Sequence, residues 1–270
     1  MKKHLLSAAL VVAGIVSAGS AMAAPVVYNL SLPNISTFDN VITGTGSTVV
    51  TAKVVSGQSV YNYIDKDGNA ATVTVTRPIS GVAANPNQSY GGLSGNVWNI
   101  GPSAGSQATN LGSPPIPGFN DAGLKFTFSS PVNAFGFEIG DWATCCTGGD
   151  RPATVEAAYG VPSQGSGLWI AYDGGAATLP ANALSNLDNP SQAEGLGVFE
   201  NFIGSIDSSG FFSSLSFFGD GFGEVLLAGG TLRFASVPQG SVGVVPEPTT
   251  MALLGLSLIG LAATRRRKAA

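Results

Sequence analysis

Histidine is almost missing from this sequence: the single one, His4, stands near the start, and residues 5–270 contain none. A Ser-His-Asp or Cys-His nucleophile, a His-ligated zinc ion and a histidine general base each require at least one histidine. The body of the chain therefore cannot carry these chemistries. A pair of carboxylates of the kind that hydrolyses glycosides, or a lysine or tyrosine base, remains open.

Charged residues are also scarce, at 10% of the chain, and basic residues are fewer than acidic ones. Residues 24–248 hold six Lys and Arg against sixteen Asp and Glu, which is a net charge of −10. Binding to a polyanion needs clustered basic side chains that displace counterions. We therefore expect no nucleic-acid partner, whereas neutral glycans and divalent cations remain open.

Only two cysteines occur, and they are neighbours, Cys145 and Cys146. An oxidising compartment favours disulfides. Adjacent cysteines close a small strained ring, pair between chains or stay free, and the sequence leaves all three states open. A vicinal disulfide between Cys145 and Cys146 would stiffen the loop that contains them.

The first 25 residues, MKKHLLSAALVVAGIVSAGSAMAAP, have the three parts of a secretory signal peptide. Two lysines form a positive start, and Leu5–Val16 form an apolar stretch. Ala21 and Ala23 place small side chains at the two positions that specify cleavage. We therefore interpret residues 1–23 as a signal peptide that the secretion machinery reads.

The last 26 residues, VPEPTTMALLGLSLIGLAATRRRKAA, contain a second apolar segment. As a helix, its apolar run over about residues 249–264 rises by about 24 Å, a little less than the roughly 30 Å hydrocarbon core of a membrane. The basic residues 265–268 stay on the cytoplasmic side by the positive-inside rule. We expect a short transmembrane helix that leaves residues 24–244 outside the inner membrane.

A Pro-Glu-Pro triplet precedes this helix, and its prolines enforce an extended, accessible backbone. The triplet, the short apolar helix and the arginine-rich tail resemble, in this order, the PEP-CTERM sorting signal, also catalogued as the ice-binding protein C-terminal domain. The resemblance covers residues 245–270 and implies a temporary anchor that a membrane protease, exosortase, removes in bacteria that make exopolysaccharide. The residues that carry it are Pro246, Glu247, Pro248, Arg265, Arg266 and Arg267.

The body between the two ends is rich in β-branched and aromatic residues and has no long helical period. Short runs bounded by turn-forming residues alternate as half-buried strands do. We expect one all-β domain, a two-sheet β-sandwich, over residues 24–244. Residues 81–123 and 180–194 are rich in turn formers and are expected to be loops, with a short hairpin as the alternative for the first and a helical turn in the second. The expected strands are PVVYNLSL, STVVTAKVV, ATVTVTR, LKFTFSS, NAFGFEIG, ATVEAAYG, GLWIAYDG, GVFENFIGSI, FSSLSFFG, EVLLAG and TLRFASV.

A second resemblance concerns the C-terminal half of the body. The stretches FSSPVNAFGFEIGDW, GLWIAYDGG, FENFIGSID and FSSLSFFGDGFGEVLLAGGTLRF resemble β-sandwich bodies that often accompany the sorting signal. This resemblance implies a jelly-roll-like sandwich fold and carries no particular activity.

Two tryptophans, Trp98 and Trp142, lie in stretches that read as loops. A tryptophan ring in a loop is a candidate platform on which a sugar ring stacks, and packing in the core is the alternative for both residues.

A calcium site is a further candidate. Asp220 and Glu224, joined by Asp141 or Asp150, offer carboxylates that would meet at one end of a sandwich. Solvation of the turns that contain them explains these acids equally well, so no cofactor is required and calcium stays open.

The segment DKDGN, residues 65–69, begins like a calcium-binding EF-hand loop, but Thr76 stands where that loop needs a glutamate. We interpret it as a hairpin turn. Thr72, Thr74 and Thr76 alternate along one strand and share one face. Ice binding needs such rows on many strands, so we interpret these threonines as an exposed strand face.

Taken together, these patterns predict an exported, non-enzymatic protein of the cell envelope or extracellular matrix. The resemblance of its tail implies sorting by exosortase after transient anchoring, and association with exopolysaccharide. The alternatives are a carbohydrate-binding module and, as a third, a glycoside-active enzyme. Such an enzyme needs two facing carboxylates, for example Glu138 with Asp141 or Glu200.

Overall fold

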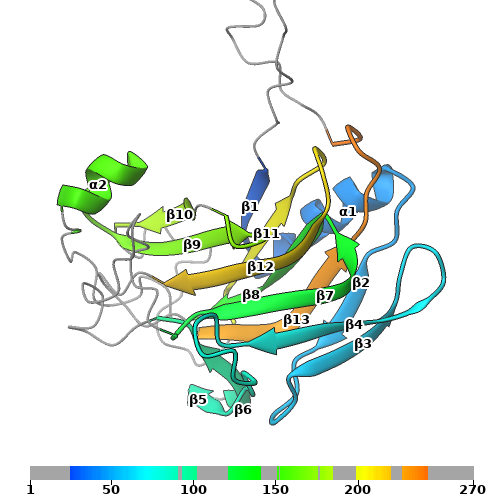
Figure 1. Cartoon of the computed structure of the whole chain (residues 1–270), viewed down its shortest axis with the longest axis horizontal. Helices are drawn as coiled ribbons and strands as arrows, with labels where there is room; N and C mark the ends of the chain where they lie inside the picture. Colours follow the sequence, from blue (N-terminus) through cyan, green and yellow to red (C-terminus); the bar gives the residue numbers. More distant parts are fainter. Residues whose placement is uncertain are drawn as a thin grey trace, which may run out of the picture.

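Two antiparallel sheets pack face to face and form a β-sandwich, as Figure 1 shows. The computed structural model describes residues 25–90, 93–101, 121–140, 151, 153–175, 177–184, 199–219 and 227–242. The expected all-β sandwich is therefore confirmed. The interpreted signal peptide and the expected C-terminal helix lie outside the described residues.

The first sheet has the strand order β1-β11-β8-β13-β6-β5, and β2 also pairs with β13. Neighbouring strands in this order run antiparallel. Its strands are β1 (Val26–Ser31), β2 (Val50–Lys53), β5 (Gln88–Tyr90), β6 (Leu93–Asn99), β8 (Ala134–Gly140), β11 (Asn201–Ile206) and β13 (Leu227–Ala235).

The second sheet has the strand order β10-β9-β12-β7-β4-β3 and is also antiparallel throughout. Most of its strands coincide with runs whose alternation predicts them. Its strands are β3 (Val60–Ile64), β4 (Ala70–Thr76), β7 (Leu124–Val132), β9 (Ser166–Tyr172), β10 (Thr178–Ala183) and β12 (Phe212–Gly219).

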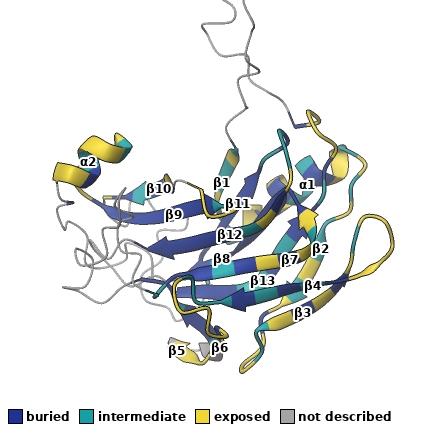
Figure 2. Ribbon diagram, in the orientation of Figure 1, coloured by how far each residue is buried: buried dark blue, intermediate teal, exposed yellow. Residues whose placement is uncertain are grey.

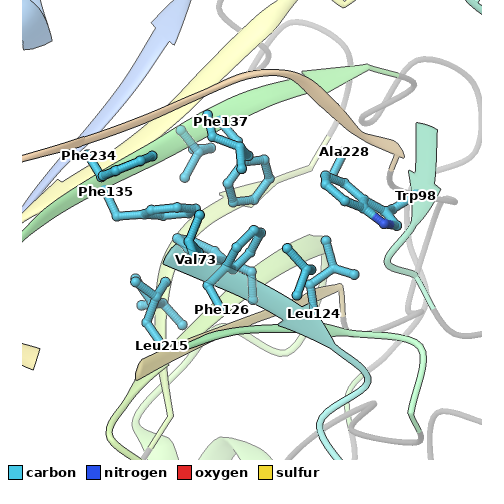
Figure 3. Close-up of a cluster of buried hydrophobic side chains, with 14 of the residues drawn as sticks. Val73, Trp98, Leu124, Phe126, Phe135, Phe137, Leu215, Ala228 and Phe234 are labelled. Atoms are coloured by element: carbon cyan, nitrogen blue, oxygen red, sulfur yellow. The ribbon is translucent and has the colours of Figure 1, made fainter. Parts of the chain in front are cut away.

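Phenylalanine rings fill the space between the sheets (Figure 3). Alternate residues of a strand point to the same side, so β7 directs Phe126 and Phe128 inward while β8 directs Phe135 and Phe137 toward them. The ring centroids of Phe126 and Phe135 lie 4.5 Å apart, and those of Phe137 and Phe217 lie 4.6 Å apart. The two sheets are thus joined by a continuous aromatic core.

Two helices cover the outer faces of the sandwich, and their exposed outer sides stand out from the buried strands in Figure 2. Helix α1 (Ser36–Gly44), which follows a short 3-10 helix (Leu32–Asn34), buries Phe38 and Ile42 in a cluster with residues of the first sheet. Helix α2 (Ala153–Tyr159) buries Val155 in a cluster with Trp169 of the second sheet.

Two expectations for individual segments are wrong. The segment ATVEAAYG is not a strand but α2, because Val155 and Tyr159 pack toward Trp169 from one helical face. EVLLAG and TLRFASV do not give two strands; their described residues form the single strand β13. Gly230 has a positive φ of 66° within an irregularity of this strand, which is where the sequence suggests a break.

The two expected loops also contain strands. The hairpin of β5 and β6 lies within residues 81–123, which confirms the alternative of a short hairpin there. Strand β10 extends to Ala183 and so occupies the first residues of the segment 180–194.

Both ends of the described body meet at one end of the sandwich. Val26, at the start of β1, pairs with Ile206, and the Ser208 hydroxyl donates to the carbonyl oxygen of Val242 at 3.0 Å. The buried Asn133 side chain donates to the Val237 carbonyl oxygen and accepts from the Val237 amide, at 2.9 and 2.7 Å. Within the described residues, no helix has the length and apolar character needed to cross a membrane.

Candidate functional site

A cavity of about 560 Å³ opens between the two sheets, and we call it the end cavity. One wall comes from the first sheet and from the loop between α1 and β2. The other wall comes from β3, the turn after it, and the end of β7. The lining residues used below are Ser47, Tyr63, Asp65, Lys66, Ser130, Val132, Phe234 and Ser236.

The floor of the end cavity is apolar and held in place. Tyr63, Val132 and Phe234 are 7%, 2% and 0% exposed. The rings of Tyr63 and Phe234 meet edge to face with centroids 4.7 Å apart. The Tyr63 hydroxyl donates to the Ser130 carbonyl oxygen at 2.8 Å, which ties β3 to the end of β7. Burial raises the pKa of Tyr63, so this hydroxyl keeps its proton at neutral pH.

Serine hydroxyls form part of the rim. The Ser47 hydroxyl donates to the Ser236 carbonyl oxygen at 3.0 Å and accepts from the Thr45 hydroxyl at 3.1 Å. The Ser236 hydroxyl donates to the Pro131 carbonyl oxygen at 3.1 Å. A serine hydroxyl has one proton and two lone pairs, so both serines keep acceptor capacity after these bonds form.

Asp65 supplies the negative charge at the rim. Its Oδ1 accepts from the backbone amides of Asn69 and Asp67 at 2.8 and 2.9 Å. The bond from Asn69 is the largest cause of a lowered pKa, and a bond from the Ser130 hydroxyl adds to it, so Asp65 is ionised at neutral pH. The same bonds close the turn between β3 and β4, which confirms the hairpin turn expected at residues 65–69.

Lys66 is the basic residue of the rim. Its ammonium group lies 2.7 Å from Asp67 Oδ2 in an exposed ion pair. Lys66 is the one basic residue among the described lining residues, Asp65 is the one acidic residue, and the exposed pair with Asp67 compensates the lysine charge only in part.

A second, smaller cavity of about 380 Å³ is lined by β3, β4 and β7 residues, among them Asn62, Thr72 and Ser129. The Thr72 amide donates to the Ser129 hydroxyl at 2.8 Å. The threonines of β4 are half-buried, and Thr74 pairs with the exposed Thr127 of β7, so the polar row continues onto the neighbouring strand.

A charge cluster lies away from both cavities. Arg233 lies 3.5 Å from Glu138 Oε1 and 3.4 Å from Asp39 Oδ1, with its guanidinium 5.8 Å from the centre of the Phe202 ring. The Glu138 side chain is 13% exposed, and this burial raises its pKa despite the nearby Arg233. Glu200, the suggested catalytic partner of Glu138, is 4% exposed, and neither acid lines the two cavities described here.

The raised pKa of Glu138 predicts a pH-dependent effect of Glu138→Gln. A carboxyl group whose pKa is raised on folding stabilises the protein below the unfolded pKa, and this contribution is lost as the pH rises through the folded pKa. Glutamine resembles the protonated acid at every pH. We therefore expect the variant to gain stability relative to the parent protein as the pH rises above the ordinary pKa of a glutamate, about 4.3.

The measurement is urea-induced unfolding at several pH values. Glu156→Gln on α2, at the opposite face of the sandwich, serves as the control and should show no such trend. A Glu138→Gln difference that stays constant or shrinks as the pH rises would contradict the burial argument.

Of the two candidate glycan contacts, the structure describes Trp98 and confirms the alternative that its ring packs in the core. Trp98 lies on β6 and is 1% exposed. Its indole Nε1 donates to the Ala84 carbonyl oxygen at 2.8 Å, and its ring packs against Phe126 (Figure 3). The ring belongs to the core and offers no surface to a sugar.

Other predicted site residues lie outside the described residues, so their predictions stand as they were. These residues include the sorting and cleavage motifs, the second tryptophan, the cysteine pair and the calcium candidates. Across the residues that the structure describes, no group of three or more Cys, His, Asp and Glu is arranged to hold a metal ion. The residues outside are Ala21, Ala23, Asp141, Trp142, Cys145, Cys146, Asp150, Asp220, Glu224, Pro246, Glu247, Pro248, Arg265, Arg266 and Arg267.

Comparison with known proteins concerns the tail alone. Residues 244–268 match the family model of the PEP-CTERM protein-sorting motif, which confirms the motif expected from the sequence. No curated protein and no solved structure matches the chain. The body therefore has to be interpreted from its own residues.

Proposed function

We propose that this chain, an exported protein whose PEP-CTERM motif directs it to an exosortase, serves without catalysis in the cell envelope or extracellular matrix, in contact with exopolysaccharide. The observation that carries the proposal is the motif itself, at residues 244–268. It begins two residues after Val242, the last described residue of the body. The folded body and the sorting tail therefore adjoin directly.

The position of the tail supports processing by a membrane protease. Val242 is held by Ser208, and Val237 is held by Asn133, so the folded body ends at a fixed point. The Pro-Glu-Pro triplet follows within a few residues and cannot join a helix that continues upstream. The prolines favour an extended backbone, so we expect a protease to meet an extended segment close to the predicted membrane helix.

Charge supports release into a matrix. The basic residues 265–268 would leave with the tail, whereas residues 24–248 carry six basic and sixteen acidic side chains. Like charges repel across an aqueous gap at short range, so the released body would be repelled by an anionic membrane surface. Processing would therefore remove both the membrane anchor and the attraction of the basic residues 265–268 to an anionic membrane surface.

A carbohydrate-binding module is the second candidate, and the end cavity favours it. The cavity lies within the range of about 300–1,000 Å³ that is typical of small-molecule sites. An enzyme that uses two carboxylates is less well supported, because Asp65 is the acidic residue among those that line this cavity.

The sorting proposal predicts that Glu247→Ala blocks processing. In the native host, we expect the parent protein to appear outside the cells as a species that begins at Ala24 and lacks the arginine-rich tail. The variant removes the charged side chain of the triplet, and we expect at least a tenfold loss of released protein. Intact-mass spectrometry of the membrane and extracellular fractions measures both species.

Glu156→Ala on α2 is the matched control and should be released like the parent protein. A full-length C-terminus retained in the membrane in both parent and variant would mean a permanent anchor and would refute the proposal. If Glu247→Ala is released in the same amount as the parent protein, processing does not depend on the glutamate of the triplet.

A further inference from the structure

We propose that the end cavity binds a neutral, polyhydroxylated ligand, such as one or two sugar units of a glycan chain. This inference rests on the proposed function, which it deepens by naming the class of ligand and the place where it binds.

Charge disfavours two other classes of ligand. Asp65 is ionised and repels carboxylates, sulfates and phosphates. Lys66 is the one basic residue among the described lining residues, and an anionic ligand would have to compete for it with Asp67, which lies 2.7 Å away. A calcium ion takes six to eight oxygen ligands, usually with several carboxylates, and the lining supplies the single carboxylate of Asp65.

The polar groups of the rim match hydroxyl groups. Ser47 and Ser236 keep acceptor lone pairs after donating their protons to backbone carbonyls. Two backbone amides of the turn bind Oδ1 of Asp65, and side-chain bonds from Ser130 and Asn69 also reach this carboxylate, so a ligand hydroxyl would share it with these donors. Charged acceptors form stronger hydrogen bonds than neutral ones, so Asp65 is the expected anchor for a ligand hydroxyl.

The apolar floor matches the other face of a sugar. A sugar ring presents hydroxyl groups at its edge and C–H groups on its faces, and C–H groups pack favourably on aromatic and aliphatic side chains. Tyr63 and Phe234 are 7% and 0% exposed, so their rings support the floor from behind. Contact with C–H groups of a ligand is left to the half-buried Val49 and Val50 and the exposed Ile64. The floor therefore demands no hydrogen bond from the ligand.

The lining is also held before any ligand arrives. The Ser47–Ser236 bond joins the loop after α1 to the end of β13, and the Tyr63–Ser130 bond joins β3 to β7. A site whose groups are already fixed loses little conformational entropy on binding. Weak binding of single sugar units, repeated along a glycan chain, would then suffice for association with a matrix.

The test is a titration of the full-length chain with cellotriose, mannotriose and isomaltotriose as neutral probes. Trigalacturonate and calcium chloride serve as charged probes. The chain is kept in a zwitterionic detergent without a sugar headgroup, and saturation-transfer NMR gives the dissociation constants. Isothermal titration calorimetry gives the dissociation constant of calcium, which has no proton for NMR to observe. We expect at least one neutral trisaccharide to bind, and both charged probes to bind at least tenfold more weakly.

Two variants that fill the end cavity from different walls locate the site. Ser130→Phe and Thr48→Trp place bulky rings at lining positions on β7 and on the loop before β2. We expect each to weaken the neutral ligand at least tenfold. Thr127→Trp, on the exposed outer face of β7, is the matched control and should stay within twofold of the parent protein. Circular dichroism confirms that each variant is folded.

Each outcome decides the inference. The inference is overturned if none of the three neutral probes binds, if both filled variants bind as tightly as the parent protein, or if a charged probe binds more tightly than the neutral ones. Release of the protein in the host is measured separately. A protein that is released normally but binds no neutral sugar would refute this inference alone, whereas one that binds sugar but stays full length in the membrane would refute the sorting proposal.

Discussion

Phe126→Ala is expected to lower the free energy of unfolding by about 3–5 kcal/mol, the usual cost of truncating a fully buried phenylalanine. Phe126 is 0% exposed and lies at the centre of the inter-sheet core. Its ring centroid is 4.5 Å from that of Phe135, 6.0 Å from Phe137, 6.3 Å from Trp98 and 6.4 Å from Phe217. Rings from both sheets would therefore lose contacts at once, and backbone hydrogen bonds within the sheets would keep the cavity from collapsing.

Urea-induced unfolding followed by circular dichroism measures this loss. Phe211→Ala is the matched control, because Phe211 is 42% exposed and should cost less than about 1 kcal/mol. Equal losses for the two variants would show that the rings of the inter-sheet core do not hold the sheets together.

Gly136→Ala is expected to cost about 3 kcal/mol, for a steric reason. Gly136 lies in β8, which is paired with β11 on one side and β13 on the other. A Cβ atom there would lie 2.4 Å from Phe202 Cζ and 2.7 Å from the Ile203 carbonyl oxygen. The carbonyl belongs to the neighbouring strand and cannot move aside without breaking the ladder, so overpacking falls at the upper end of its usual range of about 1–3 kcal/mol.

Gly44→Ala tests whether space decides this effect. Gly44 ends α1, and a Cβ atom there meets no atom within 4 Å. Alanine also has a higher helix propensity than glycine, so we expect no loss of stability at this position. The same unfolding measurement applies, and a Gly136→Ala protein as stable as its parent would contradict the close approach of Phe202.

Alternation predicted strands such as β4 and β7, in which one face is buried and the other is open. Strands β9 and β11 are buried on both faces, and the turn-forming residues that bound their apolar runs predicted them instead. No element was predicted for α1, whose sequence STFDNVITG is rich in β-branched residues and has no side-chain cap at its start. Phe38 and Ile42 are four residues apart and pack into a cluster with Phe202, so tertiary contacts decide this helix. The alternation of ATVEAAYG likewise fits a strand as well as a helix, and burial beside Trp169 selects the helix.

Trp98 illustrates a different limit of sequence reasoning. Its neighbours include glycine, asparagine and serine, which are typical of loops. Val97 and Trp98 are adjacent on β6 and both are buried, so this part of the strand does not alternate. Only its pairing with β13 brings the tryptophan into the core.

The end cavity was beyond prediction for reasons of topology. Ser47 and Ser236 are 189 positions apart in the sequence, yet their side chain and backbone are hydrogen-bonded. Asp65 could be recognised as a turn residue, but its place at the rim depends on the pairing of β3 with β4 and on the packing of the two sheets. In contrast, the sorting motif is contiguous and needs no fold to be recognised.

The place where the described body ends has a consequence for the order of events on the cell surface. Val242 lies at the end of the sandwich where Ala235 and Ser236 line the end cavity. Even fully extended, residues 243–248 span at most about 20 Å. A chain anchored by its tail would therefore hold this end of the sandwich close to the bilayer, where the lipid surface would block a long polysaccharide. Proteolysis at the triplet would then make the end cavity accessible to the matrix.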